Sequence, residues 1–178
     1  MFKKGLIIGF AAVIAMSIAA FAIQVGGVLP NVKIKNTAKA EAWIPGIGSK
    51  VVTIFYNDVD VKDVNDSLSN AIKAKNYPKA KYLGVGIANC KDAPFKPDYF
   101  ITKAAASKQA QFPDSVILLD YDHSIKNAWA LPETNEVSWV IVVGKDKKIK
   151  FMKGVKSAAE SQSLVNVVTP IIEAELKK

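Results

Sequence analysis

The chain has one cysteine, Cys90, and one histidine, His123, and these are the side chains with the greatest potential for nucleophilic chemistry. A catalytic cysteine needs a base, often an imidazole, within hydrogen-bond reach. Cys90 lies in residues 88–92 (ANCKD) and His123 in residues 120–124 (DYDHS), which we expect to be separate loops. The sequence therefore favours a packed thiol at the end of a strand over a Cys–His nucleophile.

A second chemical interpretation of Cys90 is redox chemistry of its single thiol. The neighbouring Lys91 would lower the pKa of the thiol if its ammonium group lay close to the sulfur. A lone thiol can also form a mixed disulfide with a partner protein or a small thiol. Cys90 is therefore the candidate residue for redox chemistry, and an external thiol would have to resolve the disulfide that it forms.

Four aspartates, Asp58, Asp60, Asp63 and Asp66, surround the expected start of a helix. Such residues cap free backbone N–H groups and favour the positive end of the helix dipole. Asp58, Asp60 and Asp63 are also candidate oxygen ligands for a divalent cation, calcium in particular. Their spacing lacks the glycine and the distal glutamate of an EF-hand loop. Capping is the favoured interpretation, and we expect no metal and no other cofactor.

The surroundings of His123 predict a turn. Asp120 and Asp122 are expected to make turn hydrogen bonds and to cap a short helix that carries Trp129. One histidine beside two aspartates offers fewer N or S ligands than zinc sites usually have. All three tryptophans are expected to be packing residues in the core or at strand ends, and these are Trp43, Trp129 and Trp139.

The elements that must position these residues alternate between strand and helix. Continuous β-prone apolar runs predict buried strands at residues 51–56, 82–88 and 116–119. Apolar residues at helical spacing predict a helix over residues 61–72, and a second helix is expected over residues 98–111. Buried strands joined by such helices must be parallel.

The ends of the chain contribute further elements. Alternation over residues 32–35 predicts a short edge strand, and residues 36–49, with Pro45 and two glycines, predict a connection. A capping box at residues 157–160 opens a last helix, in which Pro170 predicts a kink or a frayed turn.

Residues 137–143 and 148–152 flank the turn sequence GKDK, which is typical of a hairpin. The order is therefore a βαβ unit followed by a hairpin and a terminal helix. This order predicts an α/β fold, a thioredoxin-like mixed β-sheet flanked by helices on both faces. With 178 residues, half of them hydrophobic, the chain suits a single globular domain.

Several segments also carry a family resemblance. Residues 48–56 (GSKVVTIFY) and 118–131 resemble segments of thioredoxin-like and peroxiredoxin-like domains. A second, narrower set of residues also carries a resemblance: Asn65, Leu68, 71–73, Tyr77, Pro78, Tyr82 and 89–93. With these residues the chain resembles the YtfJ family from about residue 48 to its end. This resemblance implies an exported bacterial protein with a thioredoxin-like fold and no established activity.

The resemblance to thioredoxins also shows what this chain lacks. When the residues after Phe55 and Tyr56 are aligned, the two positions of the Cys-x-x-Cys motif fall on Asp60 and Asp63, and the facing proline falls near Ser138. Dithiol exchange needs a nucleophilic thiolate and a second, resolving thiol. Because carboxylates supply neither, the sequence argues against dithiol exchange at this position.

The first residues predict export. Lys3 and Lys4 precede a run without charge from residue 5 to residue 22, and the run ends in Ala-Phe-Ala. This pattern predicts a signal peptide over residues 1–22 and a mature domain over residues 23–178, in the periplasm or otherwise outside the cytoplasm. The alternative is an uncleaved N-terminal anchor, which would hold the domain on the outer side of the membrane.

The charge of the chain narrows the range of partners. Its formal net charge is +8, and every basic residue is a lysine. The guanidinium fork that reads phosphates and bases is absent, so specific nucleic-acid recognition is not expected. The favoured function is a non-catalytic module that binds another protein or supports an assembly of the cell envelope. The alternatives are a one-thiol redox protein that uses Cys90 and a calcium-responsive domain.

Overall fold

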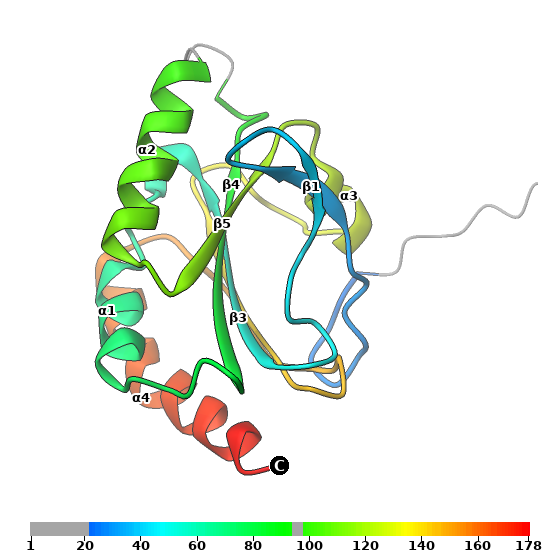
Figure 1. Cartoon of the computed structure of the whole chain (residues 1–178), viewed down its shortest axis with the longest axis vertical. Coiled ribbons are helices and arrows are strands. Elements are labelled where there is room, and N and C mark those ends of the chain that lie inside the picture. Colours follow the sequence, from blue (N-terminus) through cyan, green and yellow to red (C-terminus); the bar gives the residue numbers. More distant parts are fainter. Residues whose placement is uncertain (1–21, 94–97) are drawn as a thin grey trace, which may run out of the picture.

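The computed structural model describes residues 22–93 and 98–178, and within them the chain folds around one seven-stranded mixed sheet with the strand order β2-β1-β5-β4-β3-β6-β7 (Figure 1). The strands are β1 (Lys33–Asn36), β2 (Glu41–Trp43), β3 (Val51–Asp58), β4 (Tyr82–Asn89), β5 (Ser115–Asp120), β6 (Ser138–Val143) and β7 (Ile149–Val155). The helices are α1 (Asp66–Ala74), α2 (Asp98–Gln111), α3 (Ser124–Trp129) and α4 (Ala158–Leu176), with a 3-10 turn, η1 (Val59–Val61).

The centre of the sheet confirms the predicted βαβ order. Strand β4 pairs in parallel with β3 on one side and with β5 on the other, while β6 and β7 are antiparallel. Strand β4 is therefore the middle strand of the parallel unit. Its sequence, YLGVGIAN, places Leu83, Val85 and Ile87 toward one face of the sheet and glycine or alanine toward the other.

Helices cover both faces, as predicted. Helices α1 and α4 pack against each other and, with residues such as Val140 and Val142, form one core layer. Helix α2 lies on the same face and packs on β5 through Ile101 and Ala105. Helix α3 covers the opposite face with the fully buried Trp129. Figure 1 shows α1, α2 and α4 on one side of the sheet and α3 on the other.

Two predictions about the first strands are wrong. Strand β1 is not at the edge, because it pairs with both β2 and β5. Strand β2 lies inside residues 36–49, which we expected to be a connection without strands. The Asn36 side chain stabilises the turn between β1 and β2, since its Oδ1 accepts hydrogen bonds from the backbone N–H groups of Ala38 and Ala40. The resulting hairpin is short, and its outer strand leaves Trp43 56% exposed, so Trp43 is not the packing residue that we expected.

One helix prediction needs correction. Helix α1 begins at Asp66 and not near residue 61, because the chain first forms the 3-10 turn η1. At Pro170 a kink or a frayed turn was expected, and helix α4 continues from Pro170 to Leu176 without the frayed turn. The capping box at its start is confirmed, because the Ser157 side chain accepts a hydrogen bond from the backbone of Glu160.

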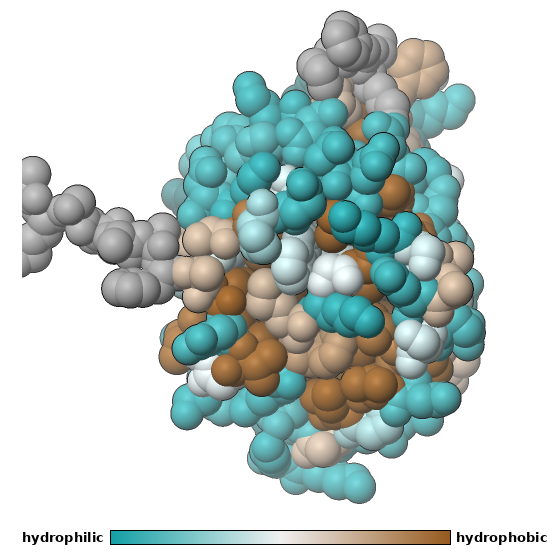
Figure 2. Space-filling view, turned by 180° about the vertical axis from the view of Figure 1, so that it is seen from behind, coloured by the Kyte–Doolittle hydropathy of each residue, from teal (hydrophilic) through white to brown (hydrophobic). Residues whose placement is uncertain are grey.

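The hydropathy of the surface differs between parts of the molecule. Figure 2 shows the face opposite to that of Figure 1, where hydrophobic residues gather in the lower half of the view and hydrophilic residues cover the upper half. Among the described residues, no helix is both long enough and apolar enough to cross a membrane. The predicted signal peptide or anchor lies almost entirely outside the described residues.

Candidate functional site

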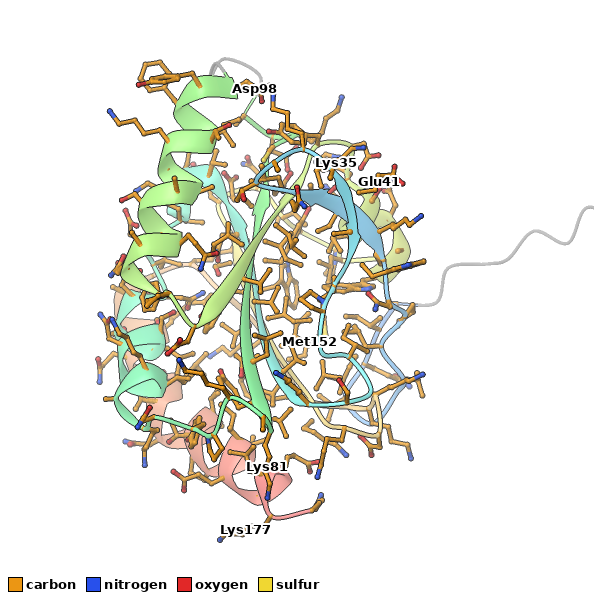
Figure 3. All side chains as sticks on the ribbon, in the orientation of Figure 1. Lys35, Glu41, Lys81, Asp98, Met152 and Lys177 are labelled. Atoms are coloured by element: carbon orange, nitrogen blue, oxygen red, sulfur yellow. The ribbon has the colours of Figure 1, made fainter. Side chains whose placement is uncertain are left out.

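Three parallel strands end side by side on polar residues. Asp58, Asn89 and Asp120 are the last residues of β3, β4 and β5, they lie in register, and each is at most 1% exposed. The carboxyl ends of parallel strands are the usual location of ligand sites in α/β sheets. We call these three residues, with the loops that follow them, the carboxyl edge. It lies toward the end of the molecule that carries Asp98, whereas Lys81 and Lys177 mark the opposite end (Figure 3).

Asp58 joins two loops of the carboxyl edge. Its Oδ1 accepts a hydrogen bond from the backbone of Asp60 (2.9 Å), and its Oδ2 accepts one from the backbone of Glu136 (2.8 Å). The predicted capping role is therefore confirmed for Asp58, although it caps the turn η1 and not α1. The carboxylate fixes the segment after β3 to the segment before β6.

Two other aspartates of the acidic cluster, Asp63 and Asp66, face lysines. Asp63 pairs with Lys62 and with Lys108 of α2, whose Nζ also lies 2.5 Å from Asp66. Hydrogen bonds from Lys62 and Lys108 lower the pKa of Asp63. Asp60 lies in the 3-10 turn η1 and Asp63 in the turn that follows it, so neither is on α1. In the described part of the chain, no three His, Cys, Asp or Glu side chains form a group that could hold a metal ion, the candidate ligands Asp58, Asp60 and Asp63 included.

A serine occupies the position where the thioredoxin alignment places a proline. Ser138 is the first residue of β6, and its hydroxyl accepts a hydrogen bond from the side-chain amide of Asn65 and donates one to Asn57 Oδ1. Asn65 is the N-cap residue of α1 but makes no capping bond with its side chain. The amide Oδ1 of Asn65 is buried and has no hydrogen-bond partner among the described residues. The sequence analysis assigned no role to either asparagine.

Asp120 has the turn role that the sequence predicts. It accepts hydrogen bonds from the backbone of Ser124 and Ile125 at the start of α3 and from the hydroxyl of Tyr56 (3.1 Å). Burial raises the pKa of Asp120, and burial together with the carboxylate raises the pKa of Tyr56. Asp122 accepts a hydrogen bond from the backbone of Ser124 as well, so both predicted caps are present.

Cys90 directly follows β4 and is 6% exposed. Its thiol donates a hydrogen bond to the carbonyl of Ala88 (3.4 Å). Burial, followed by the charge of Asp120, raises the pKa of the thiol to about 12. The expectation that Lys91 would lower this pKa is therefore wrong, because burial and the nearby carboxylate dominate. At neutral pH the thiol is protonated and shielded, a combination that disfavours nucleophilic chemistry.

His123 pairs with an aspartate. Its Nε2 lies 2.7 Å from Asp92 Oδ1, and Asp92 Oδ2 accepts hydrogen bonds from Asn89 (2.5 Å) and Thr134 (3.3 Å). Although burial acts to raise it, the bond from Asn89 and the nearby imidazole hold the pKa of Asp92 below its usual range. His123 also has a left-handed backbone with φ of 62°. The Asp92 carboxylate thus joins the loop after β4 to the segments that carry His123 and Thr134, and it engages the imidazole.

The sequence could have indicated part of this network. Asn89 and Asp92 flank Cys90 in the segment that carried the family resemblance, yet only the cysteine was considered for chemistry. Thr134 gave no signal, because it lies in an irregular segment without a motif. It becomes recognisable only when the fold brings residue 134 against residue 92, 42 positions away.

Comparison with known proteins shows that the chain is similar to one family of bacterial proteins. Residues 29–173 match the model of a family described as "Bacterial protein of unknown function (YtfJ_HI0045)". An uncharacterized protein of Haemophilus influenzae is 31% identical over 120 residues, which are 67% of this chain and 64% of that protein. The uncharacterized protein YtfJ of Escherichia coli is 27% identical over 125 residues, 70% of this chain and 67% of that protein.

The fold also matches solved structures. A thiol:disulfide interchange protein from Bacteroides sp. superimposes with a TM-score of 0.59 at 13% sequence identity, over 86% of this chain and 93% of that protein. At this identity the likeness concerns the fold. It confirms the predicted thioredoxin-like mixed sheet with helices on both faces.

Proposed function

The chain belongs to the family of bacterial proteins of unknown function described as YtfJ_HI0045, and from this premise we propose that it is a non-catalytic thioredoxin-like module that binds a protein partner outside the cytoplasm. One observation carries the proposal: the fold of a thiol-disulfide oxidoreductase is retained while its one thiol, Cys90, is buried and has a pKa of about 12. Dithiol exchange requires two accessible thiols, one of them readily ionised.

The carboxyl edge supports a binding role because its loops are fixed. Asp58 ties the loop after β3 to the segment before β6. Asp92, in the loop after β4, binds His123 in the loop after β5 and Thr134 in the segment before β6. Loops held in one conformation lose little entropy when a partner binds. A preformed surface of this kind suits recognition of another folded protein.

The proposed location rests on the first residues of the chain. The lysines and the apolar run over residues 1–22 support a signal peptide or an N-terminal anchor. With either one, the proposed domain of residues 23–178 would lie outside the cytoplasm.

A reductase assay tests the absence of catalysis. We expect no reduction of insulin disulfides by the wild-type protein in the presence of dithiothreitol. A double variant, Asp60→Cys with Asp63→Cys, is the matched comparison, because it places two thiols at the aligned positions on the same fold. Wild-type activity well above the background of dithiothreitol alone would refute the proposal.

Site-specific crosslinking in the host cell envelope tests the binding role. A photoreactive residue in place of Glu136, beside Asp58 on the carboxyl edge, is expected to give one discrete crosslinked product. The same residue in place of Lys81, at the opposite end of the molecule, is the control and is expected to give none (Figure 3). Equal products from both positions, or none from Glu136, would contradict binding through this edge.

A further inference from the structure

A cavity of about 360 Å³ opens between α1 and α2 on the face of the sheet that these helices cover. This volume lies within the range of small-molecule sites. Helix α1 packs on α4 and helix α2 packs on β5, so the two helices diverge above β4. The space between them is lined mainly by apolar side chains, among which are Phe55, Ile72, Tyr82, Ile101, Phe112 and Ile117.

Short residues of β4 form part of the cavity floor. Gly84, Gly86 and Ala88 alternate toward this face, opposite to the side on which Val85 and Ile87 enter the core. Side chains of the neighbouring strand β5 lean over the two glycines, Ser115 over Gly84 and Ile117 over Gly86. The floor therefore combines small residues of β4 with side chains of β5.

Two residues that line the cavity, Asn65 and Tyr82, each have a buried polar atom without a hydrogen-bond partner among the described residues. Asn65 lines the cavity and is 3% exposed. Its amide nitrogen donates to Ser138, which leaves Oδ1 as the free acceptor, with no partner among the described residues. A buried acceptor in this state gains from a hydrogen-bond donor brought by a ligand.

A positive charge lies farther along α1. The ammonium group of Lys73 donates to the neutral carbonyl of Gln111 (2.8 Å) and lies 5.6 Å from the centre of the Phe112 ring. No carboxylate of the described residues lies within 4 Å of it, whereas the nearby Lys108 has two, Asp63 and Asp66. The charge of Lys73 is therefore available to an anion.

The two polar features are separated by eight residues of α1, which is about 12 Å along a helix axis. We propose that this cavity binds an amphiphile with one hydrocarbon chain, whose carboxylate pairs with Lys73 and whose hydroxyl donates to Asn65 Oδ1. The hydrocarbon chain lies against the apolar walls, which include Phe55, Ile72 and Ile117. The charge of Lys73 selects an anionic head group, and the apolar lining selects a hydrocarbon chain.

Calorimetric titration with 10-hydroxydecanoate, below the concentration at which it aggregates, tests the proposal. We expect saturable binding of one molecule. Decane-1,10-diol, which lacks the carboxylate, is expected to bind at least tenfold more weakly, and decanoate, which lacks the hydroxyl, several-fold more weakly. The absence of saturable binding, or equal affinities for the three probes, would overturn the proposal.

Two pairs of variants locate the site. Ala104→Phe, which fills the cavity from α2, is expected to abolish binding, whereas Ala106→Phe, on the exposed side of the same helix, leaves it unchanged. Lys73→Gln is expected to weaken binding at least tenfold, and Lys153→Gln on β7 leaves it unchanged. Circular dichroism verifies that each variant is folded. Wild-type affinity in folded Ala104→Phe would show that the cavity is not the site.

Discussion

The carboxyl edge and the cavity between α1 and α2 use their polar groups in opposite ways. At the edge, the buried carboxylates of Asp58 and Asp120 each accept at least two hydrogen bonds from the chain itself. At the cavity, Asn65 Oδ1 has no partner among the described residues. The two buried carboxylates of the edge therefore have structural roles, whereas the cavity keeps an unpaired acceptor that a ligand could satisfy.

The largest expected change in the free energy of unfolding comes from a substitution at the carboxyl edge. Asp120→Ala removes the acceptor of two buried groups, the Ile125 backbone N–H and the Tyr56 hydroxyl, whereas the Ser124 N–H keeps Asp122 as an acceptor. We expect the free energy of unfolding to fall by about 3 kcal/mol in urea titrations, since each buried group left unpaired is costly. The control Asp122→Ala, at an exposed position, should lose clearly less. Equal losses would mean that burial of the carboxylate has no structural role.

Asp58→Ala removes the second buried carboxylate that connects loops of the carboxyl edge. Two backbone N–H groups, those of Asp60 and Glu136, lose their acceptor, and a loss of about 2 kcal/mol is expected. Asp60→Ala is the matched variant, because it changes an exposed carboxylate two residues away. If Asp60→Ala is as destabilising as Asp58→Ala in the same urea titration, the anchoring role assigned to Asp58 is wrong.

The cavity predicts a contrast between two neighbouring alanines of α2. Ala105 is 6% exposed and packs in the core with Ile101 and Leu119, so Ala105→Leu overpacks this layer and should cost about 1.5 kcal/mol. Ala104 lines the open cavity, so Ala104→Leu should change the free energy of unfolding by less than about 0.5 kcal/mol. A similar penalty for both variants would indicate that the space beside Ala104 is filled.

The smallest expected effect is on the pH dependence of stability, through the Asp92 carboxylate. Because the pKa of Asp92 is lower in the folded chain than its usual value of 3.8, the ionised carboxylate adds stability above the usual value, and this contribution is lost as the pH falls through the folded pKa. Thermal unfolding between pH 6 and pH 3 should show a shallower loss of stability for Asp92→Asn than for the wild type. The raised pKa of Asp120 acts in the opposite direction in both proteins. An identical slope in the two proteins would rule out the stabilising role of ionised Asp92.

Much of the fold could be predicted because its signals are local. The apolar runs gave β3, β4 and β5, and the helix over residues 98–111 was found with its bounds. Strand β2 was missed, because a three-residue strand with two exposed ends has almost no hydrophobic pattern. The start of α1 was placed too early, because Val61 and Val64 follow the helical spacing while Asp58 caps a 3-10 turn before them.

The site was less accessible to prediction, because its contacts join distant segments. Capping by Asp58 and Asp120 follows from local turn chemistry and was predicted. The pairing of His123 with Asp92 bridges 31 positions, and the bond from Asn65 to Ser138 bridges 73. Such contacts depend on strand order and register, which one sequence does not specify.

The intact mass of the protein purified from the envelope of its own host, without a reducing agent, tests the central claim most directly. The account predicts the mass of residues 23–178 with an unmodified Cys90, because a buried thiol with a raised pKa does not react. A mass that includes a thiol adduct on Cys90, or a disulfide-linked partner, would contradict the account and support a one-thiol redox protein.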